Sequence, residues 1–195
     1  DFCLSRGLGD VYKRQELYHA HAQRLALMLQ NQTEEEFADS RFQVLSELTR
    51  LRQLCCDPAL VYENYEGGSA KLDLCIELIQ SAVESGHKIL LFSQFTSMIE
   101  ILTARLQEES ISYFVLQGST KKEQRAQMVE QFNRDDTSVF CISLKAGGTG
   151  LNLTGADIVI HYDPWWNVAV ENQATDRAHP VSYTHLRAHE TGRNL

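Results

Sequence analysis

The sequence lacks any long hydrophobic run. Apolar stretches such as "ILLF" at residues 89–92 are short, and the mean hydropathy is −0.30. Because a helix needs roughly 20 consecutive apolar residues to cross a bilayer, we expect no membrane span and no membrane partner. The first residues also lack a basic stretch followed by an apolar one, so nothing indicates export.

Cysteine pairs with metal-binding or redox spacing are also absent. The five cysteines show no C-x-x-C spacing and stand at Cys3, Cys55, Cys56, Cys75 and Cys141. His185 and His189 have helical i, i+4 spacing but no third ligand, so we predict no metal site. Cys75 and Cys141 lie in apolar runs, where reduced cysteines pack as small hydrophobic residues. This favours a cytoplasmic protein.

Basic residues are scarce. The chain has 18 Lys and Arg against 26 Asp and Glu, a net charge of −8. Any contact with nucleic acid must therefore rest on a local surface rather than on overall charge. The Walker A pattern G-x-x-x-x-G-K-[ST] is absent from all 195 residues, so we expect the principal nucleotide-phosphate site to lie outside this chain.

The two ends show neither clean helical nor clean strand periodicity. Residues 1–15, "DFCLSRGLGDVYKRQ", and residues 181–195, "VSYTHLRAHETGRNL", resemble translated adaptor sequence. We therefore predict that both segments are non-native tails outside the fold.

Residues 16–70 are predicted to form a helical extension. One helix is expected over residues 16–30 and a second over about 33–55, where Thr33 can cap an acidic first turn. Pro58 follows the second helix, and "VYENYEGGS" at residues 61–69 has the composition of a linker. We interpret this region as the connection from a preceding domain.

Helices and strands alternate over residues 71–180. The predicted helices cover about 71–85, 97–109, 121–133 and 167–178, and the predicted strands cover 88–92, 113–116, 139–143 and 158–162. The strands are continuous apolar runs, which are typical of sheets buried on both faces. The expected fold class is α/β, with a parallel β-sheet sandwiched by helices.

Polar residues follow each predicted strand, in the segments 93–95, 117–120, 143–152 and 163–167. Because parallel strands end at a common edge, where α/β proteins bind ligands, we expect these segments to lie together. The third segment has glycines at 147, 148 and 150, which allow a phosphate or nucleic-acid strand to approach the backbone. Lys145 could add positive charge. Each segment alone could also be an ordinary connection.

Four stretches in this order and spacing resemble the successive motifs of a known family. They are "KILLFSQFTSMIEIL", "LQGSTKKEQRAQMVEQFN", "VFCISLKAGGTGLNLTGADIVIHYDPWWN" and "ENQATDRAH". The similarity covers about residues 45–179 and is to the C-terminal RecA-like lobe of bacterial Swi/Snf-type ATPases, helicase-like DNA translocases of superfamily 2. The resemblance implies an N-terminal RecA-like lobe as partner. That lobe would hold most of the ATP and Mg²⁺ site.

The resemblance also implies roles for individual residues. It assigns coupling between nucleotide and DNA to Lys145, Gly147, Gly148, Thr149, Gly150 and Asn152. It assigns sequence-independent contacts with the backbone of double-stranded DNA to Ser93, Gln94, Gly118, Ser119, Lys145, Trp165 and Trp166. Neutral side chains and backbone amides can hold phosphates, which is compatible with an acidic chain. Core packing is the alternative for the tryptophans. Lys121, Lys122 and Arg125 could add local positive charge for DNA, but we favour the alternative that they form a solvated helix face.

Arg177 matches the first arginine of the family's last motif, which implies an arginine finger on the γ-phosphate of ATP. Gln173 and Asp176 would orient it, with ordinary helix-surface polarity as an equal alternative. In the family a second arginine follows, whereas here Pro180 comes after His179. We therefore expect that this chain alone does not hydrolyse ATP.

The sequence thus predicts the second RecA-like lobe of an ATP-dependent DNA translocase. Two alternatives stay open. One is a non-catalytic module of the same fold that binds nucleic acid or protein. The other is an unrelated doubly wound α/β protein that binds a small phosphorylated ligand.

Overall fold

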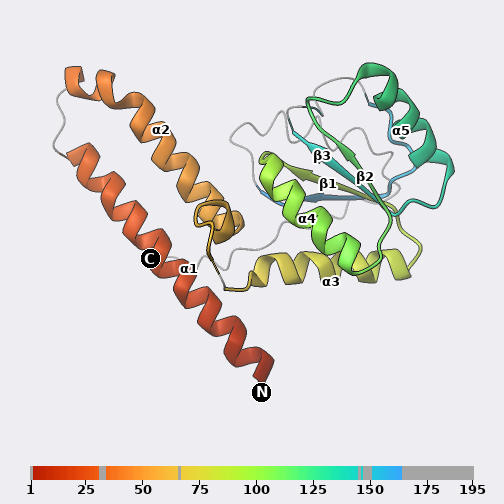
Figure 1. Cartoon of the computed structure of the whole chain (residues 1–195), viewed down its shortest axis with the longest axis horizontal. Coiled ribbons are helices and arrows are strands. Elements are labelled where there is room, and N and C mark those ends of the chain that lie inside the picture. Colours follow the sequence, from red (N-terminus) through yellow and green to blue (C-terminus); the bar gives the residue numbers. More distant parts are fainter. Residues whose placement is uncertain (1, 31–33, 66, 145, 147–150, 164–195) are drawn as a thin grey trace. The chain divides into compact units, whose positions relative to one another are not determined.

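The computed structural model describes residues 2–30, 34–65, 67–144, 146 and 151–163. For residues 2–11, 13 and 34–39 only the backbone is described. The chain divides into two compact units, Asp1–Asp73 and Leu74–Leu195 (Figure 1). None of the helices in these described ranges is long and apolar enough to cross a membrane.

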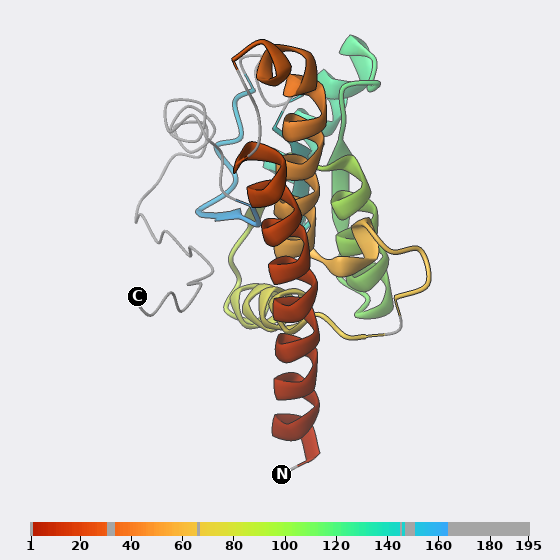
Figure 2. The ribbon, with the colours of Figure 1, turned by 90° about the vertical axis from the view of Figure 1, so that its left-hand side faces the viewer.

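The first unit is a helical hairpin. Helices α1 (Phe2–Gln30) and α2 (Glu34–Cys56) lie side by side (Figure 2), and Leu25 of α1 packs with Val44 and Leu51 of α2. The short 3₁₀ helix η1 (Pro58–Leu60) follows. The Asp57 carboxylate accepts a hydrogen bond from the Ala59 N–H at 2.8 Å and so ends α2 with a capped turn.

The start of α1 corrects the sequence prediction. The helix was expected to begin at Glu16, but it begins at Phe2 and includes residues 2–15. This stretch has no proline, and its two glycines cost only about 1 kcal/mol each in a helix. Adding turns to an existing helix requires no new nucleus, so a helix can extend without hydrophobic periodicity. The adaptor origin of both ends stays a prediction.

A polar network holds the hairpin to the segment after η1. Glu47 of α2 is buried, and its carboxylate accepts hydrogen bonds from His21 Nδ1 at 3.1 Å and Arg50 Nη1 at 3.2 Å. The other ring nitrogen of His21 lies 2.9 Å from the Tyr62 hydroxyl. A buried carboxylate is tolerated only with such partners, so this network stabilises the first unit.

The second unit confirms the predicted α/β class. Its elements are α3 (Ala70–Glu84), whose first turn belongs to the first unit, β1 (Ile89–Ser93), α4 (Thr96–Glu108), β2 (Tyr113–Leu116), α5 (Lys122–Arg134), β3 (Val139–Ser143) and β4 (Ile158–His161). The sheet order is β2-β3-β1-β4, and all three strand pairs are parallel. The expected helix over residues 167–178 lies outside the described residues.

The strand register brings the ends of all four strands to one edge of the sheet. Phe92 of β1 pairs with Ile142 of β3 and with His161 of β4, and Leu116 of β2 also pairs with Ile142. These residues are the last or next to last of their strands. The polar segments that follow the strands therefore start at the same edge, which we call the carboxyl edge.

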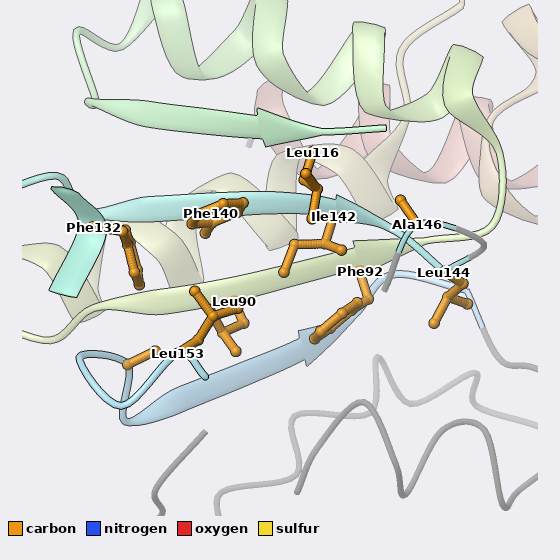
Figure 3. Packing of buried hydrophobic residues seen from close by; sticks show 10 residues of the cluster. Leu90, Phe92, Leu116, Phe132, Phe140, Ile142, Leu144, Ala146 and Leu153 are labelled. Carbon is orange, nitrogen blue, oxygen red and sulfur yellow. The ribbon is translucent and has the colours of Figure 1, made fainter. Parts of the chain in front are cut away.

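The core lies on both faces of the sheet because side chains alternate along each strand. Leu90 and Phe92 of β1 and Phe140 and Ile142 of β3 share the face on which Phe132 of α5 packs (Figure 3). All five of these side chains are fully buried.

The opposite face carries Leu91 and Cys141, which are partners in the register. As the sequence predicted, Cys75 and Cys141 are both buried. Burial, with a smaller contribution from Cys75, raises the pKa of the Cys141 thiol. This thiol therefore stays neutral and packs as a core residue.

Candidate functional site

The candidate site is the carboxyl edge of the sheet. Five of the residues predicted for it lie within the described ranges: Ser93, Gln94, Gly118, Ser119 and Asn152. The others lie outside the described residues: Lys145, Gly147, Gly148, Thr149, Gly150, Trp165, Trp166, Gln173, Asp176 and Arg177. The geometry of the edge is therefore built from the turns after β1 and β2, the residues after β3 and the end of β4.

The turn after β1 is fixed by two hydrogen-bonded groups. The Ser93 side chain is buried, and its hydroxyl accepts a hydrogen bond from the Phe95 N–H at 3.2 Å. The Gln94 N–H donates to both oxygens of the Asp163 carboxylate, at 3.2 and 3.1 Å. Asp163 is itself buried and lies two residues beyond the end of β4. It therefore ties the turn after β1 to the end of β4.

The Gln94 side chain offers a donor at this edge. Its Nε2 atom is buried and has no hydrogen-bond partner among the described residues. A buried amide without a partner costs free energy, and an acceptor oxygen of a ligand would satisfy it. The Gln94 amide is thus an uncharged donor that is left unused at this edge within the described part of the chain.

The turn after β2, residues 117–120, is exposed at Gly118 and Ser119. The Gln117 N–H donates to the Thr120 hydroxyl at 3.1 Å, and the Thr120 N–H donates to the Gln117 carbonyl at 3.1 Å. These two hydrogen bonds close the turn, and its two small residues, Gly118 and Ser119, are exposed to solvent.

Arg125 of α5 corrects the expectation of a solvated helix face. Its Nε donates to the Thr120 carbonyl at 2.9 Å, and its Nη2 donates to the carbonyls of Gly118 at 3.2 Å and Gln117 at 3.4 Å. The guanidinium has five donors in a rigid fork, which suits several carbonyls at once. The side chain is therefore half-buried against the 117–120 turn.

Asn133 at the end of α5 holds the segment that follows the Gly-rich stretch. Its Nδ2 donates to the Asn152 carbonyl at 2.9 Å, and its Oδ1 accepts from the Gly155 N–H at 2.9 Å. Leu153, between these contacts, is fully buried in the core. The Asn152 side chain itself is exposed. Asn152 is therefore presented at the surface at the start of a segment that is held at residues 152 and 155.

We predict that Asn133→Ala lowers the free energy of unfolding by about 1–2 kcal/mol, because two hydrogen bonds to the backbone are lost. Gly155→Ala should act in the same direction, since an added Cβ would lie 3.1 Å from the Asn133 Cα and Oδ1 atoms. Urea unfolding of the 195-residue chain measures both effects. Arg134→Ala, at an exposed position on the same helix, is the control, and an unchanged midpoint for Asn133→Ala would contradict the prediction.

The opposite edge of the sheet is held by Lys88. Its Nζ donates to the Phe132 carbonyl and, at 2.6 Å, to the Asp135 carbonyl, which ties the end of α5 to the start of β1. Desolvation lowers the pKa of Lys88, although Asp135 and Asp136 oppose the shift. Lys88 therefore has a structural role and lies at the end of the sheet opposite the carboxyl edge.

The second unit is a parallel α/β lobe with helices on both faces and polar turns at the carboxyl ends of its strands, as in RecA-like domains. Comparison with protein families gives the family. The helicase conserved C-terminal domain matches residues 70–181.

Curated relatives agree with this assignment. The chain is 43% identical over 146 residues to an uncharacterized ATP-dependent helicase of Mycoplasma pneumoniae, covering 73% of this chain and 14% of that protein. It is 42% identical over 146 residues to the putative ATP-dependent helicase/translocase YwqA of Bacillus subtilis, covering 71% of this chain and 16% of that protein. The chain therefore spans only a small part of the length of these relatives.

Solved structures agree as well. The SWI2/SNF2 ATPase C-terminal domain of Sulfolobus solfataricus is 32% identical with a TM-score of 0.71, over 82% of this chain and 71% of that one. The ATPase core of Sulfolobus solfataricus in complex with dsDNA is 28% identical with a TM-score of 0.72, over 89% of this chain and 36% of that one. The chain belongs to the helicase conserved C-terminal domain family and is of the SWI2/SNF2 type. This membership excludes the unrelated doubly wound α/β protein.

Proposed function

We propose that the chain is the C-terminal lobe of an ATP-dependent DNA translocase of the Swi/Snf type. It would contribute DNA-backbone contacts and an arginine finger to ATP hydrolysis in the cleft shared with an N-terminal RecA-like lobe. The observation that carries the proposal is the carboxyl edge, where the turns assigned to DNA by the family resemblance start at the ends of parallel strands. The similarity to an ATPase core in complex with dsDNA supports double-stranded DNA as the partner.

The DNA contacts would be neutral and independent of sequence. Gln94 offers an unsatisfied Nε2 donor, and Gly118 and Ser119 are exposed small residues. Such groups hold phosphate oxygens, which all sequences share. Since the Ser93 hydroxyl is engaged by Phe95, the role of Ser93 would be to shape the Gln94 turn. Lys145, Trp165 and Trp166 are assigned to DNA on the family resemblance alone.

The ATP site would be shared between two lobes. This lobe would supply Gly147, Gly148, Thr149, Gly150 and Asn152 for coupling, and Arg177 with Gln173 and Asp176 for hydrolysis. Within the described ranges no group of three or more His, Cys, Asp or Glu residues could hold a metal ion, and the Asp163 carboxylate is engaged by Gln94. On the family resemblance, we assign Mg²⁺ mainly to the N-terminal lobe.

The proposed function is tested by ATP hydrolysis with and without double-stranded DNA. The full-length protein that contains this lobe should hydrolyse ATP, and DNA should stimulate it regardless of sequence. The 195-residue chain alone should not hydrolyse ATP, because it lacks a Walker A lysine. Binding of DNA or protein without any hydrolysis by the full-length protein would favour the non-catalytic module instead.

We predict that Trp165→Ala combined with Trp166→Ala weakens DNA stimulation of the full-length protein, because aromatic contact with DNA is lost. The DNA concentration for half-maximal stimulation should rise while the melting temperature stays within about 2 °C, as for a surface substitution. Differential scanning calorimetry and a DNA titration measure the two quantities. A large fall in melting temperature would mean that the tryptophans are core residues, which the prediction excludes.

A further inference from the structure

Arg125 binds the 117–120 turn from one side. Its guanidinium donates to three backbone carbonyls, those of Gln117, Gly118 and Thr120. The residue itself stands five positions beyond Thr120, on the first turns of α5. It therefore crosses back over the start of the helix to reach the turn.

These bonds determine where the N–H groups of the turn point. In a planar trans peptide the C=O and the N–H point in opposite directions, and no described peptide bond is cis. The carbonyls of Gln117 and Gly118 share their peptide planes with the N–H groups of Gly118 and Ser119. Since the carbonyls face Arg125, these two N–H groups face away from it.

The outward side of the turn is open. The N–H groups of Gly118 and Ser119 have no hydrogen-bond partner within the described part of the chain, and both residues are exposed. A Cβ added at Gly118 would meet no atom within 4 Å. Two adjacent amide donors in such a place suit the oxygens of a phosphate.

Charge favours the same assignment. The guanidinium is a cation and lies directly behind the turn. It can thus attract an anion through the turn without touching it. In a chain with a net charge of −8, such a local cation offsets the unfavourable overall field.

We propose that Arg125 is a positioning residue that holds the 117–120 turn with the amides of Gly118 and Ser119 directed at a DNA phosphate. This inference rests on the proposed function and adds to it the atoms that make the contact. Arg125 acts through the turn and does not itself contact DNA.

The test compares Arg125→Ala and Arg125→Lys with the control Arg134→Ala in the full-length protein. Arg134 is on the same helix, is exposed and pairs with Glu130, so its removal changes the charge equally. A mixed-sequence DNA duplex is titrated at several salt concentrations, with ATP hydrolysis as the readout. The melting temperature is recorded for each variant.

We expect Arg125→Ala to raise the DNA concentration for half-maximal stimulation about tenfold, roughly the factor for one lost hydrogen bond. Arg125→Lys should raise it nearly as much, because an ammonium cannot reproduce the fork that holds three carbonyls. The dependence of half-saturation on salt should keep its slope, since no cation that contacts phosphate is removed. Arg134→Ala should match the wild type.

Several results would overturn the inference alone. One is a wild-type half-saturating DNA concentration in Arg125→Lys together with a salt-dependence slope reduced by about 1 in Arg125→Ala. This combination would make Arg125 a direct phosphate contact. Another is a lower melting temperature or turnover with unchanged half-saturation, which would make its role only structural. A wild-type protein that DNA does not stimulate would overturn the proposed function, and the inference with it.

Discussion

Arg177→Ala in the full-length protein should lower DNA-stimulated ATP hydrolysis by about 10³–10⁵-fold, the range measured for arginine fingers in other nucleotide hydrolases. The physical reason is that a cation at the γ-phosphate stabilises the charge that develops in the transition state. DNA affinity should stay close to that of the wild type, because the finger acts on the nucleotide. Steady-state turnover and equilibrium DNA binding measure the two quantities separately.

The control for this result is Arg134→Ala, which removes the same charge from an exposed helix surface. It should leave turnover within about twofold, as for most surface substitutions. Gln173→Ala and Asp176→Ala distinguish orientation of the finger from ordinary surface polarity, since only orienting residues should lower turnover. Unchanged turnover in Arg177→Ala would remove the finger role while leaving the family assignment intact.

The strands and their order along the chain could be predicted closely from the sequence. The strand predicted over residues 113–116 is found as Tyr113–Leu116, and the strand over 139–143 as Val139–Ser143. Continuous apolar runs are typical of strands that are covered on both faces: β3 is buried at every position, and the side chains of β2 are at least partly buried. The carboxyl edge followed from this, since parallel strands end together.

The residues that hold the edge could not be predicted in the same way. Asp163 bonds to Gln94 across 69 positions of sequence, and Asn133 bonds to Gly155 across 22. A polar side chain that binds the backbone of a distant segment leaves no periodic pattern. Arg125 looked like helix-surface charge because it reaches back to the turn before its own helix, a contact that helical spacing does not indicate. The one available signal was an acidic residue shortly after an apolar run, as at Asp163 after "IVIHY".

The helix start at Phe2 could not be predicted from hydrophobic periodicity either. Hydrophobic spacing predicts which helical face packs against a neighbour, but α1 continues over residues 2–15 where that spacing is absent. Leu25 marks the part of α1 that packs on α2, and the predicted segment coincides with it. Helix extent and helix packing are thus separate properties, and the sequence pattern reports the second.

Phe132→Ala should lower the free energy of unfolding of the second unit by about 3–5 kcal/mol, the usual cost of truncating a buried phenylalanine. The ring is fully buried, lies edge-on to Phe140 with centroids 5.1 Å apart, and has the Lys88 Nζ 4.3 Å from its centroid. Truncation would leave a cavity and remove both ring contacts. Urea unfolding of the 195-residue chain, followed by far-UV circular dichroism, measures the change in midpoint.

Phe42→Ala is the matched control, because the Phe42 side chain is 85% exposed and the chemical change is identical. It should shift stability by no more than about 0.5 kcal/mol. A Phe132→Ala cost below about 1 kcal/mol would contradict the position of α5 against the sheet. The packing of α5 on the sheet brings Arg125 to the 117–120 turn and Asn133 to the Asn152 carbonyl. The Phe132 contact therefore helps to set the geometry of the carboxyl edge.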